Sequence, residues 1–289
     1  MKQENTKACK FGMVIDLDKC TGCASCMVSC MSENNVPFKE DESNKKDSIT
    51  WMHVYKLTNG KSFPDAEIVY MPRPCQHCGG KGDHGHSPCV SVCPATATDY
   101  GYDTGIVSQI YTRCFGCRYC MGACPYHARY FNWWDPKWPE GMENHLSPDV
   151  SPRTRGVVEK CSFCYHRYQA ARDQAFADGD KDHIPEENYQ TACATACPSG
   201  AIIFGDLNNP EHKVHQIVKP DPRPDPENKD IVGKSRNPKA FRLLERLGTN
   251  TKVYYLSERE WVRKAGDNYL DGEWEQMKNH HGNGVSSHG

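Results

Sequence analysis

The stretch CFGCRYCMGACP, residues 114–125, decides the fold of this chain. Its four cysteines have the spacing C-x2-C-x2-C-x3-C, and a proline follows the last of them. Thiolates this closely spaced can surround three corners of an inorganic cluster, which a zinc ion at one tetrahedral point does not require. The proline cannot continue regular backbone hydrogen bonding, so it turns the chain away after the fourth cysteine.

Versions of this run occur four times, and in two of them a loop is inserted before the third cysteine. The four groups are, in chain order, Cys20, Cys23, Cys26 and Cys30; Cys75, Cys78, Cys89 and Cys93; Cys114, Cys117, Cys120 and Cys124; and Cys161, Cys164, Cys193 and Cys197. Groups one and three have the spacing of bacterial ferredoxins. The pattern predicts four [4Fe-4S] clusters, with iron held by these cysteines. Zinc is the main alternative, because C-x2-C pairs also build zinc ribbons.

Composition excludes several other classes. A disulfide scaffold is typical of short secreted chains with a signal peptide, whereas residues 1–10 are polar and lack an apolar segment. No apolar stretch is long enough to span a bilayer, so we expect a chain that is soluble by itself and reaches a membrane through a partner. The formal net charge of −2 gives no reason to expect a nucleic acid partner. Cys9 lies outside every group and is expected to be a free thiol.

The crossing rule of two-cluster ferredoxins predicts how the groups pair. There, the fourth cysteine of each run ligates the other cluster. Groups two and three are adjacent, and the segment between them suggests a strand, a turn at Gly105 and a second strand. Groups one and four then pair around them, with strands at Val14–Leu17 and Ala201–Phe204. The predicted fold class is α+β, with two nested bacterial-ferredoxin-like two-cluster modules, long loops and an extended C-terminal arm.

The crossing rule also predicts the module boundaries and ligand sets. The outer module comprises residues 1–74 and 125–207, the inserted inner module residues 75–124, and the arm residues 208–289. The predicted sets are Cys20, Cys23, Cys26 and Cys197 for cluster 1; Cys161, Cys164, Cys193 and Cys30 for cluster 2; Cys75, Cys78, Cys89 and Cys124 for cluster 3; and Cys114, Cys117, Cys120 and Cys93 for cluster 4. Ligation of each cluster within its own group is the alternative.

Basic residues beside the ligands offer charge compensation. Four loaded clusters would bring the chain to a net charge of about −10, and buried charge needs nearby compensation. The candidates that flank the cysteines are Lys19, Arg113, Arg118, Arg129, Lys160 and Arg167. Each either tunes a cluster potential or is a solvated surface base.

Three further runs carry a resemblance to a known family. They are Cys-Pro-Tyr-His-Ala-Arg (124–129), Lys-Cys-Ser-Phe-Cys-Tyr-His-Arg (160–167) and Ala-Cys-Pro-Ser-Gly-Ala (196–201), the last followed by Phe-Gly-Asp (204–206). Over residues 11–207 the chain resembles the four-cluster iron–sulfur subunit of dimethyl sulfoxide reductase and polysulfide reductase type complexes. The resemblance implies crossed ligation, a large molybdopterin-oxidoreductase-like partner and an integral membrane quinone-binding partner. It also implies a cluster order of group one, four, two and three, with group three nearest the membrane.

Residues 130–136, 148–160 and 237–256 are similar to a narrower branch, alternative complex III and the menaquinone reductase complex of sulfate reducers. That branch implies a multihaem cytochrome c as a further partner and a large subunit without molybdenum. It favours the periplasmic face of the membrane, reached with a signal-bearing partner, and leaves the cytoplasmic face open. The expected function is relay of single electrons, with no substrate chemistry in this chain. The alternative is the beta subunit of a molybdopterin oxidoreductase acting on sulfur or nitrogen compounds.

Some segments lie outside the repeats. His84 and His86 stand in the group-two loop and are expected to be surface residues, and Trp133, Trp134 and Trp138 suggest core packing or a partner interface. After a proline-rich stretch, Asn237 and Pro238 predict a helix through Leu247, and Lys252–Leu256 suggests a short strand. We expect this tail to dock a partner, so that deletion of residues 208–289 leaves the cluster content intact.

Overall fold

The computed structural model describes residues 9–37, 49–80, 87–180, 184–220 and 235–267. The strands are β1 (Phe11–Asp16), β2 (His53–Thr58), β3 (Ile68–Arg73), β4 (Thr98–Tyr100), β5 (Val107–Gln109), β6 (Tyr130–Phe131), β7 (Val158–Glu159), β8 (Ile202–Asp206), β9 (Ala240–Phe241) and β10 (Val253–Leu256). The helices are α1 (Ser25–Glu33), α2 (Pro88–Ser91), α3 (Tyr119–Gly122), α4 (Tyr165–Ala177), α5 (Ala192–Thr195), α6 (Lys213–Val218) and α7 (Glu260–Asp267). Three 3-10 turns complete the list: η1 (Tyr111–Arg113), η2 (Met142–His145) and η3 (Glu245–Leu247). The fold is therefore α+β, as the sequence predicts.

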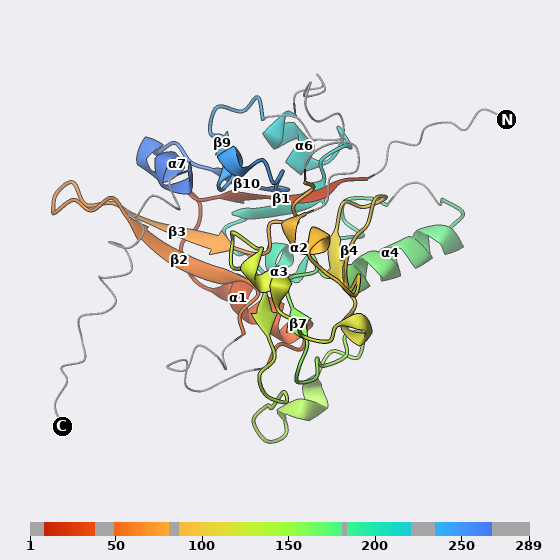
Figure 1. Ribbon diagram of the computed structural model, residues 1–289. Helices are drawn as coiled ribbons and strands as arrows, with labels where there is room; N and C mark the ends of the chain where they lie inside the picture. Colours follow the sequence, from red (N-terminus) through yellow and green to blue (C-terminus); the bar gives the residue numbers. More distant parts are fainter. Residues whose placement is uncertain (1–8, 38–48, 81–86, 181–183, 221–234, 268–289) are drawn as a thin grey trace, which may run out of the picture.

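A four-stranded sheet with the order β8-β1-β10-β9 organises the molecule (Figure 1). β1 pairs antiparallel with β8 and parallel with β10. Both faces of β1 are buried, since Val14 packs toward α6 while Met13 and Ile15 join the large core that contains the cysteines. Pairing of β1 with β8 brings the start of group one beside the end of group four.

Three two-stranded sheets accompany the main sheet in the described residues. β4 and β5 pair antiparallel on either side of Gly105, which has a φ of +69°, so the predicted strand–turn–strand is confirmed. β6 pairs with β7, and β2 pairs with β3 in a longer hairpin that projects from the body in Figure 1.

The four cysteine runs fold alike, each with its third cysteine in a helix. The third cysteines lie in α1, α2, α3 and α5, and the fourth follows one helical turn later. One turn displaces the fourth cysteine by about 6 Å along the helix axis. The x3 spacing therefore directs the last two cysteines of a run into neighbouring spaces.

The C-terminal segment differs from its predicted form. Within the described residues 235–267, β10 is an inner strand of the main sheet, and Val253, Tyr254 and Tyr255 are buried. The extended arm is therefore wrong for this segment, and so is the helix from Asn237, where β9 and η3 form instead. The strand at Lys252–Leu256 is correct. Its partner β1 lies about 240 residues away in sequence, a long-range pairing that local patterns cannot reveal.

Some predictions concern residues outside the described ranges, namely the His84 and His86 loop and the last residues of the tail. Across the described residues, no helix combines the length and apolar character needed to cross a membrane.

Candidate iron–sulfur cluster sites

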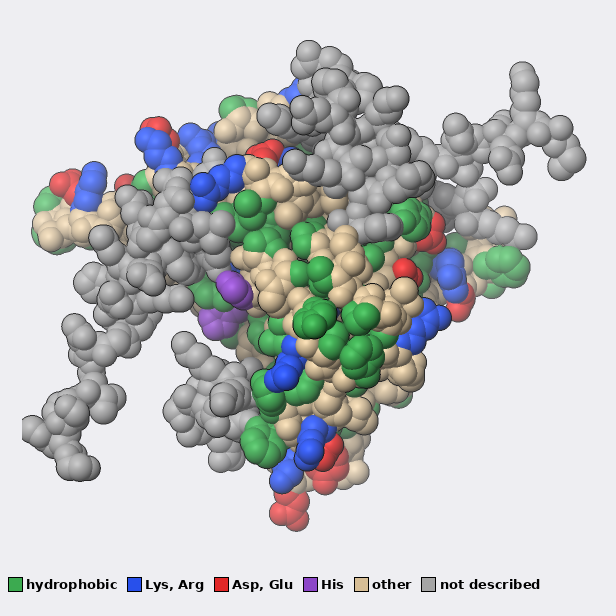
Figure 2. Space-filling view, viewed as in Figure 1, with side chains coloured by type: hydrophobic (Ala, Val, Ile, Leu, Met, Phe, Trp, Pro, Cys, Tyr) green, Lys and Arg blue, Asp and Glu red, His purple; other side chains and the backbone are tan. Residues whose placement is uncertain are grey.

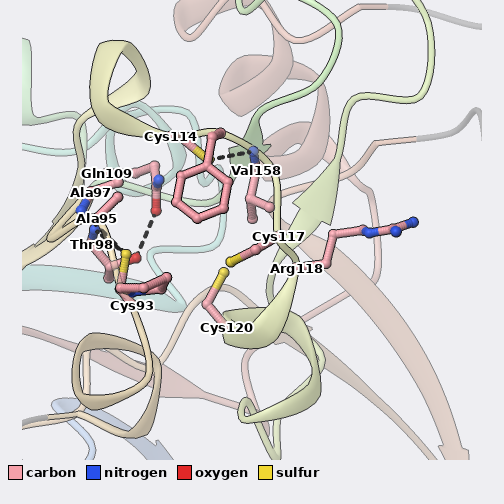
Figure 3. A pocket seen from close by; sticks show the side chains of 13 residues that line it. Cys93, Ala95, Ala97, Thr98, Gln109, Cys114, Cys117, Arg118, Cys120 and Val158 are labelled. Atoms are coloured by element: carbon pink, nitrogen blue, oxygen red, sulfur yellow. Dashed lines mark hydrogen bonds between the residues drawn. The ribbon is translucent and has the colours of Figure 1, made fainter.

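Three cavities each gather four cysteines from two different groups. The sets are Cys20, Cys23, Cys26 and Cys197; Cys75, Cys78, Cys89 and Cys124; and Cys93, Cys114, Cys117 and Cys120. The cavities have similar volumes of about 300, 330 and 290 Å³ in that order, open solvent included. Figure 3 shows the third, where the sulfur atoms of Cys93, Cys117 and Cys120 point inward and Arg118 extends away.

The remaining four cysteines, Cys30, Cys161, Cys164 and Cys193, are all buried together. Burial and then the charges of the other three thiolates raise the pKa of Cys30 well above its usual value. The Asn34 amide nitrogen lies 3.8 Å from the sulfur atoms of both Cys30 and Cys164. Each of the four sets thus takes three cysteines from one group and the fourth from another.

Backbone N–H groups point at several cysteine sulfurs. The amides of Ala97 and Thr98 lie 3.2 and 3.4 Å from the Cys93 sulfur, and the Val158 amide lies 3.5 Å from that of Cys114. Burial alone raises the pKa of Cys93, but these backbone donors outweigh it and the pKa lies below its usual value. Such donors favour the thiolate form, which is the form that binds metal.

A left-handed residue precedes the second cysteine in all four runs. Gly22, His77, Gly116 and Phe163 have φ values of +73°, +45°, +76° and +55°. Glycine adopts this conformation freely, whereas it costs another residue about 1–2 kcal/mol. A side chain at Gly22 would meet the Tyr70 ring at 2.6 Å, and one at Gly116 would meet the Gly156 carbonyl at 2.2 Å. Two runs therefore need glycine here, while the other two accept strain to place an aromatic ring.

The six candidate bases fall into two classes. Lys160 and Arg129 are buried, whereas the other four lie at the surface or are partly exposed. Of those, Lys19 pairs with Asp16 at 3.4 Å, Arg118 stacks on Trp133, and Arg167 pairs with Glu33. Lys160 donates to the carbonyls of Val107 and Cys161, so it joins the inner hairpin to group four. Compensation close to the sulfurs thus comes from few of the predicted bases.

Arg129 lies between two of the cysteine sets. Its Nη1 donates to Gln109 Oε1 at 2.9 Å, while Nε and Nη2 are buried without a hydrogen-bond partner among the described residues. Burial alone would lower its pKa, but the thiolates of Cys89, Cys120 and Cys75 outweigh burial and raise it. Two guanidinium nitrogens without a hydrogen-bond partner, close to the sulfurs of Cys75, Cys89 and Cys120, are what a buried, negatively charged inorganic cluster would satisfy. The residues therefore fit cubane clusters.

Sequence reasoning missed two buried basic side chains, of which Lys252 lies near the sulfurs of Cys78 and Cys75. Lys252 donates to the His77 carbonyl, and burial lowers its pKa to about 7. Arg153 pairs with Glu159, and both are fully buried. Lys252 and Arg153 stand apart from every cysteine run in the sequence, so no local pattern marks them.

The comparisons with known proteins agree on a cofactor. Two family models, both described as a 4Fe-4S dicluster domain, match residues 66–140 and 113–201. The chain is 57% identical to the menaquinone reductase iron–sulfur cluster-binding subunit of Nitratidesulfovibrio vulgaris, over 91% of this chain and 95% of that protein. It belongs to the family of iron–sulfur subunits of the dimethyl sulfoxide reductase and polysulfide reductase type.

Two further relatives of this iron–sulfur subunit widen the comparison. The Hdr-like menaquinol oxidoreductase iron–sulfur subunit 1 of Archaeoglobus fulgidus is 37% identical over 85% of this chain and 82% of its own. A polysulfide reductase subunit of Wolinella succinogenes is 32% identical over 86% and 95%. Together with the cysteine count, the two dicluster matches show that the iron–sulfur subunit binds four [4Fe-4S] clusters.

The seventeenth cysteine of the iron–sulfur subunit has a different environment. Cys9 lies beside Asp206, and burial together with that carboxylate raises its pKa to about 12. Cys9 belongs to none of the four cysteine sets, and the prediction that it is a free thiol stays a prediction.

Proposed function

We propose that this iron–sulfur subunit relays single electrons between a peripheral redox partner and a quinone-reactive membrane subunit, in a menaquinone reductase-type complex. The carrying observation is the exposure of the cysteine sets. Two sets contain exposed or half-exposed cysteines, with Cys23 and Cys117 as examples, and two are almost wholly buried. Two accessible cofactors joined by two buried ones form a path with an entrance and an exit.

The ligand sets of this proposal are the crossed ones, and the modules are nested. Support comes from the shared cavities, from the burial of Cys30 with group four, and from the β1–β8 pairing of the outer segments. When bound, the clusters supply reversible one-electron storage. The chain's own residues fix their spacing, exclude water from the middle pair and direct N–H groups at the sulfurs.

Support for the proposed order of the clusters comes from neighbouring sulfurs. Cys26 and Cys30 are one helical turn apart in α1, so cluster 1 adjoins cluster 2. After burial, the charge of Cys75 raises the pKa of Cys161 most, so cluster 2 adjoins cluster 3. Arg129 acts on sulfurs of clusters 3 and 4, so these are neighbours. The proposed order 1, 2, 3, 4 is the one implied by the family resemblance.

The membrane partner is proposed to dock beside cluster 4. Phe115, Tyr119 and Trp134 are 65%, 68% and 60% exposed, on or near the cysteine run of group three. Figure 2 shows hydrophobic side chains gathered in the middle of the face where α2 and α3 lie. Exposed aromatic side chains of this kind typify partner surfaces. We also propose that the subunit lies at the periplasmic face of the membrane, held there by its partners, and that the complex exchanges electrons with a multihaem cytochrome c.

The test is metal analysis and redox titration of the purified complex. We expect about sixteen irons in this subunit and reversible reduction of all four clusters by a menaquinol analogue. Stoichiometric zinc in place of iron contradicts the proposal. If neither a quinol analogue nor a reduced partner can reduce the clusters, they have a structural role only.

A second candidate is the beta subunit of a molybdopterin oxidoreductase that acts on sulfur or nitrogen compounds. The similarity to the polysulfide reductase subunit favours it. The two candidates differ in the large partner, since only the second requires molybdenum there. Molybdenum analysis of the co-purified large subunit decides between them, and a co-purified multihaem cytochrome favours the first.

A further inference from the structure

Two aromatic rings meet where the predicted inner and outer modules touch. His77 stands between the first two cysteines of group two, and Phe163 stands at the same position of group four. Their ring centroids lie 3.6 Å apart with an interplanar angle of 18°. We propose that this stacked pair is the contact across which an electron passes between clusters 2 and 3, an inference that rests on the proposed relay function.

Each ring belongs to a residue that adjoins a cysteine of a buried or largely buried set. His77 directly precedes Cys78 in the chain, and Phe163 directly precedes Cys164. Each ring is therefore linked through the backbone to a cysteine of its own set. Both side chains are fully buried. A continuous bonded path thus runs from one set into one ring, across a single van der Waals gap, and from the second ring into the other set.

Hydrogen bonds hold both rings in place. The Val107 amide donates to His77 Nδ1 at 3.1 Å, which fixes the imidazole plane. Lys252 donates to the His77 carbonyl, and the Tyr189 hydroxyl donates to the Phe163 carbonyl at 2.7 Å. The pair is therefore anchored from the inner hairpin, from the residue before β10 and from the group-four loop, and little freedom is left for the stack.

The backbone supports a specific role for the rings. Both residues have left-handed φ values, a conformation that the corresponding Gly22 and Gly116 of groups one and three adopt without strain. A strained conformation persists only where the surroundings enforce it, and it marks functional positions more often than chance packing does. At this position of the run, the strain occurs only in the two groups whose clusters face each other across the modules.

The step itself is simple. One electron leaves a reduced cluster of one module and reduces an oxidised cluster of the other, and no bond forms or breaks. The rings are not oxidised or reduced in this step. They supply the packed contact across which the electron passes between the two buried cofactors.

The test uses F163L in the full complex, because leucine keeps an apolar side chain in the core while removing the ring. Electrons are delivered from one end of the path, and rapid freeze-quench EPR follows their arrival at the clusters of the other module. We expect loss of the fast phase of arrival, with iron content and the four midpoint potentials unchanged. The ring swap H77F/F163H keeps two stacked rings and should retain the fast phase.

Tyr168→Leu is the matched control, because Tyr168 is a buried aromatic of the same core that contacts Phe11 and Tyr189 instead of the stacked pair. An unchanged fast phase in fully loaded F163L overturns the inference while leaving the relay intact. If F163L does not load iron, H77L carries the same test. If neither F163L nor H77L loads iron while H77F/F163H does, the stacked pair has a structural role, and this result also overturns the inference. Absence of any fast phase in the wild-type complex counts instead against the relay function.

Discussion

The two middle cysteine sets and the two end sets differ sharply in their surroundings. All of Cys30, Cys161, Cys164 and Cys193 are buried, whereas the set at the group-one end has Cys23 exposed and two more half-exposed. A buried thiolate is costly unless positive charge or hydrogen bonds compensate it. The middle of the molecule therefore has to supply all of its compensation from protein groups, while at the ends solvent adds to what the protein supplies.

The distribution of basic side chains follows this difference. Lys160 and Lys252 are buried beside the middle sets and Arg129 is buried between a middle set and an end set, while Lys19 and Arg118 are exposed beside the end sets. Buried charges interact strongly because water does not screen them, and exposed ones interact weakly. We infer that the protein sets the potentials of the middle clusters and leaves the end clusters open to their partners. Four predictions, from the largest effect to the smallest, test this contrast.

Removing one cysteine from a middle set should do more damage than removing one from an end set. Cys193→Ala deletes a buried ligand, and loss of the cluster would leave a cavity in the core. We therefore expect loss of cluster 2 and of much of the assembled subunit. Cys23→Ala, at an exposed position, should lose only about four of the roughly sixteen irons. Iron per chain and the yield of complex measure both effects. Equal yields for the two variants would contradict the contrast between middle and ends.

The end runs should be sensitive to backbone conformation. Gly116→Ala places a Cβ 2.2 Å from the Gly156 carbonyl and demands a left-handed alanine, which together cost about 2–5 kcal/mol. We expect cluster 4 to be lost on heating before the other three, as its EPR signal would report. Gly122→Ala in α3 is the matched control, because nothing lies within 4 Å of the added carbon. A G116A variant that keeps cluster 4 as long as G122A does would show that the loop adapts.

Removing the Arg129 guanidinium should lower the potentials of two clusters together. The cation favours the reduced, more negative cluster, so Arg129→Gln should shift the midpoints of clusters 3 and 4 downward by tens of millivolts. About 59 mV corresponds to a tenfold change in a one-electron equilibrium. Redox titration followed by EPR gives the shifts. Exposed Arg118→Gln is the control and should shift only cluster 4, and by less, because water screens its charge. A shift confined to one cluster in R129Q would argue against a shared position.

Some parts of the fold could be predicted from the sequence, and others could not. The four runs predict the cluster number, the β4–β5 hairpin and the outer strands, because thiolate spacing and turn residues are local signals. The role of β10 was not predictable, since its partner β1 is distant in sequence and the residues before it look like a linker. The packing of Val253 and Tyr255 in the core now suggests that deletion of residues 208–289 would disturb the fold, contrary to the sequence-based expectation.

Some of the buried basic residues could be predicted from the sequence, and others could not. Lys160 and Arg129 were found because they flank cysteines, but nothing local distinguishes them from exposed Lys19. Burial depends on which strands cover a residue, and that is a tertiary property. Lys252 lacks any cysteine neighbour in sequence, and only its place beside His77 in space reveals it.

The smallest predicted effect concerns an ion pair that ties α1 to α4 near Cys164. Glu33 accepts from Arg167 Nε and Nη2 at 2.5 and 2.7 Å, and His166 Nε2 lies 2.7 Å from it. Hydrogen bonds from Arg167 lower the pKa of Glu33, outweighing burial. Because both side chains are partly exposed, we expect Glu33→Gln to destabilise the subunit by only about 0.5–1 kcal/mol.

The lowered pKa of Glu33 determines how the stabilisation from this ion pair depends on pH. A carboxylate whose pKa is lower in the folded state stabilises the fold above its usual pKa, and it loses that contribution as the pH falls through the lowered value. The stability gap between wild type and E33Q should therefore be full at neutral pH and shrink in acid, as thermal loss of cluster absorbance would measure. Glu187→Gln, at an exposed position, is the control and should change little. A gap that widens in acid would mean that Glu33 acts through something other than its paired carboxylate.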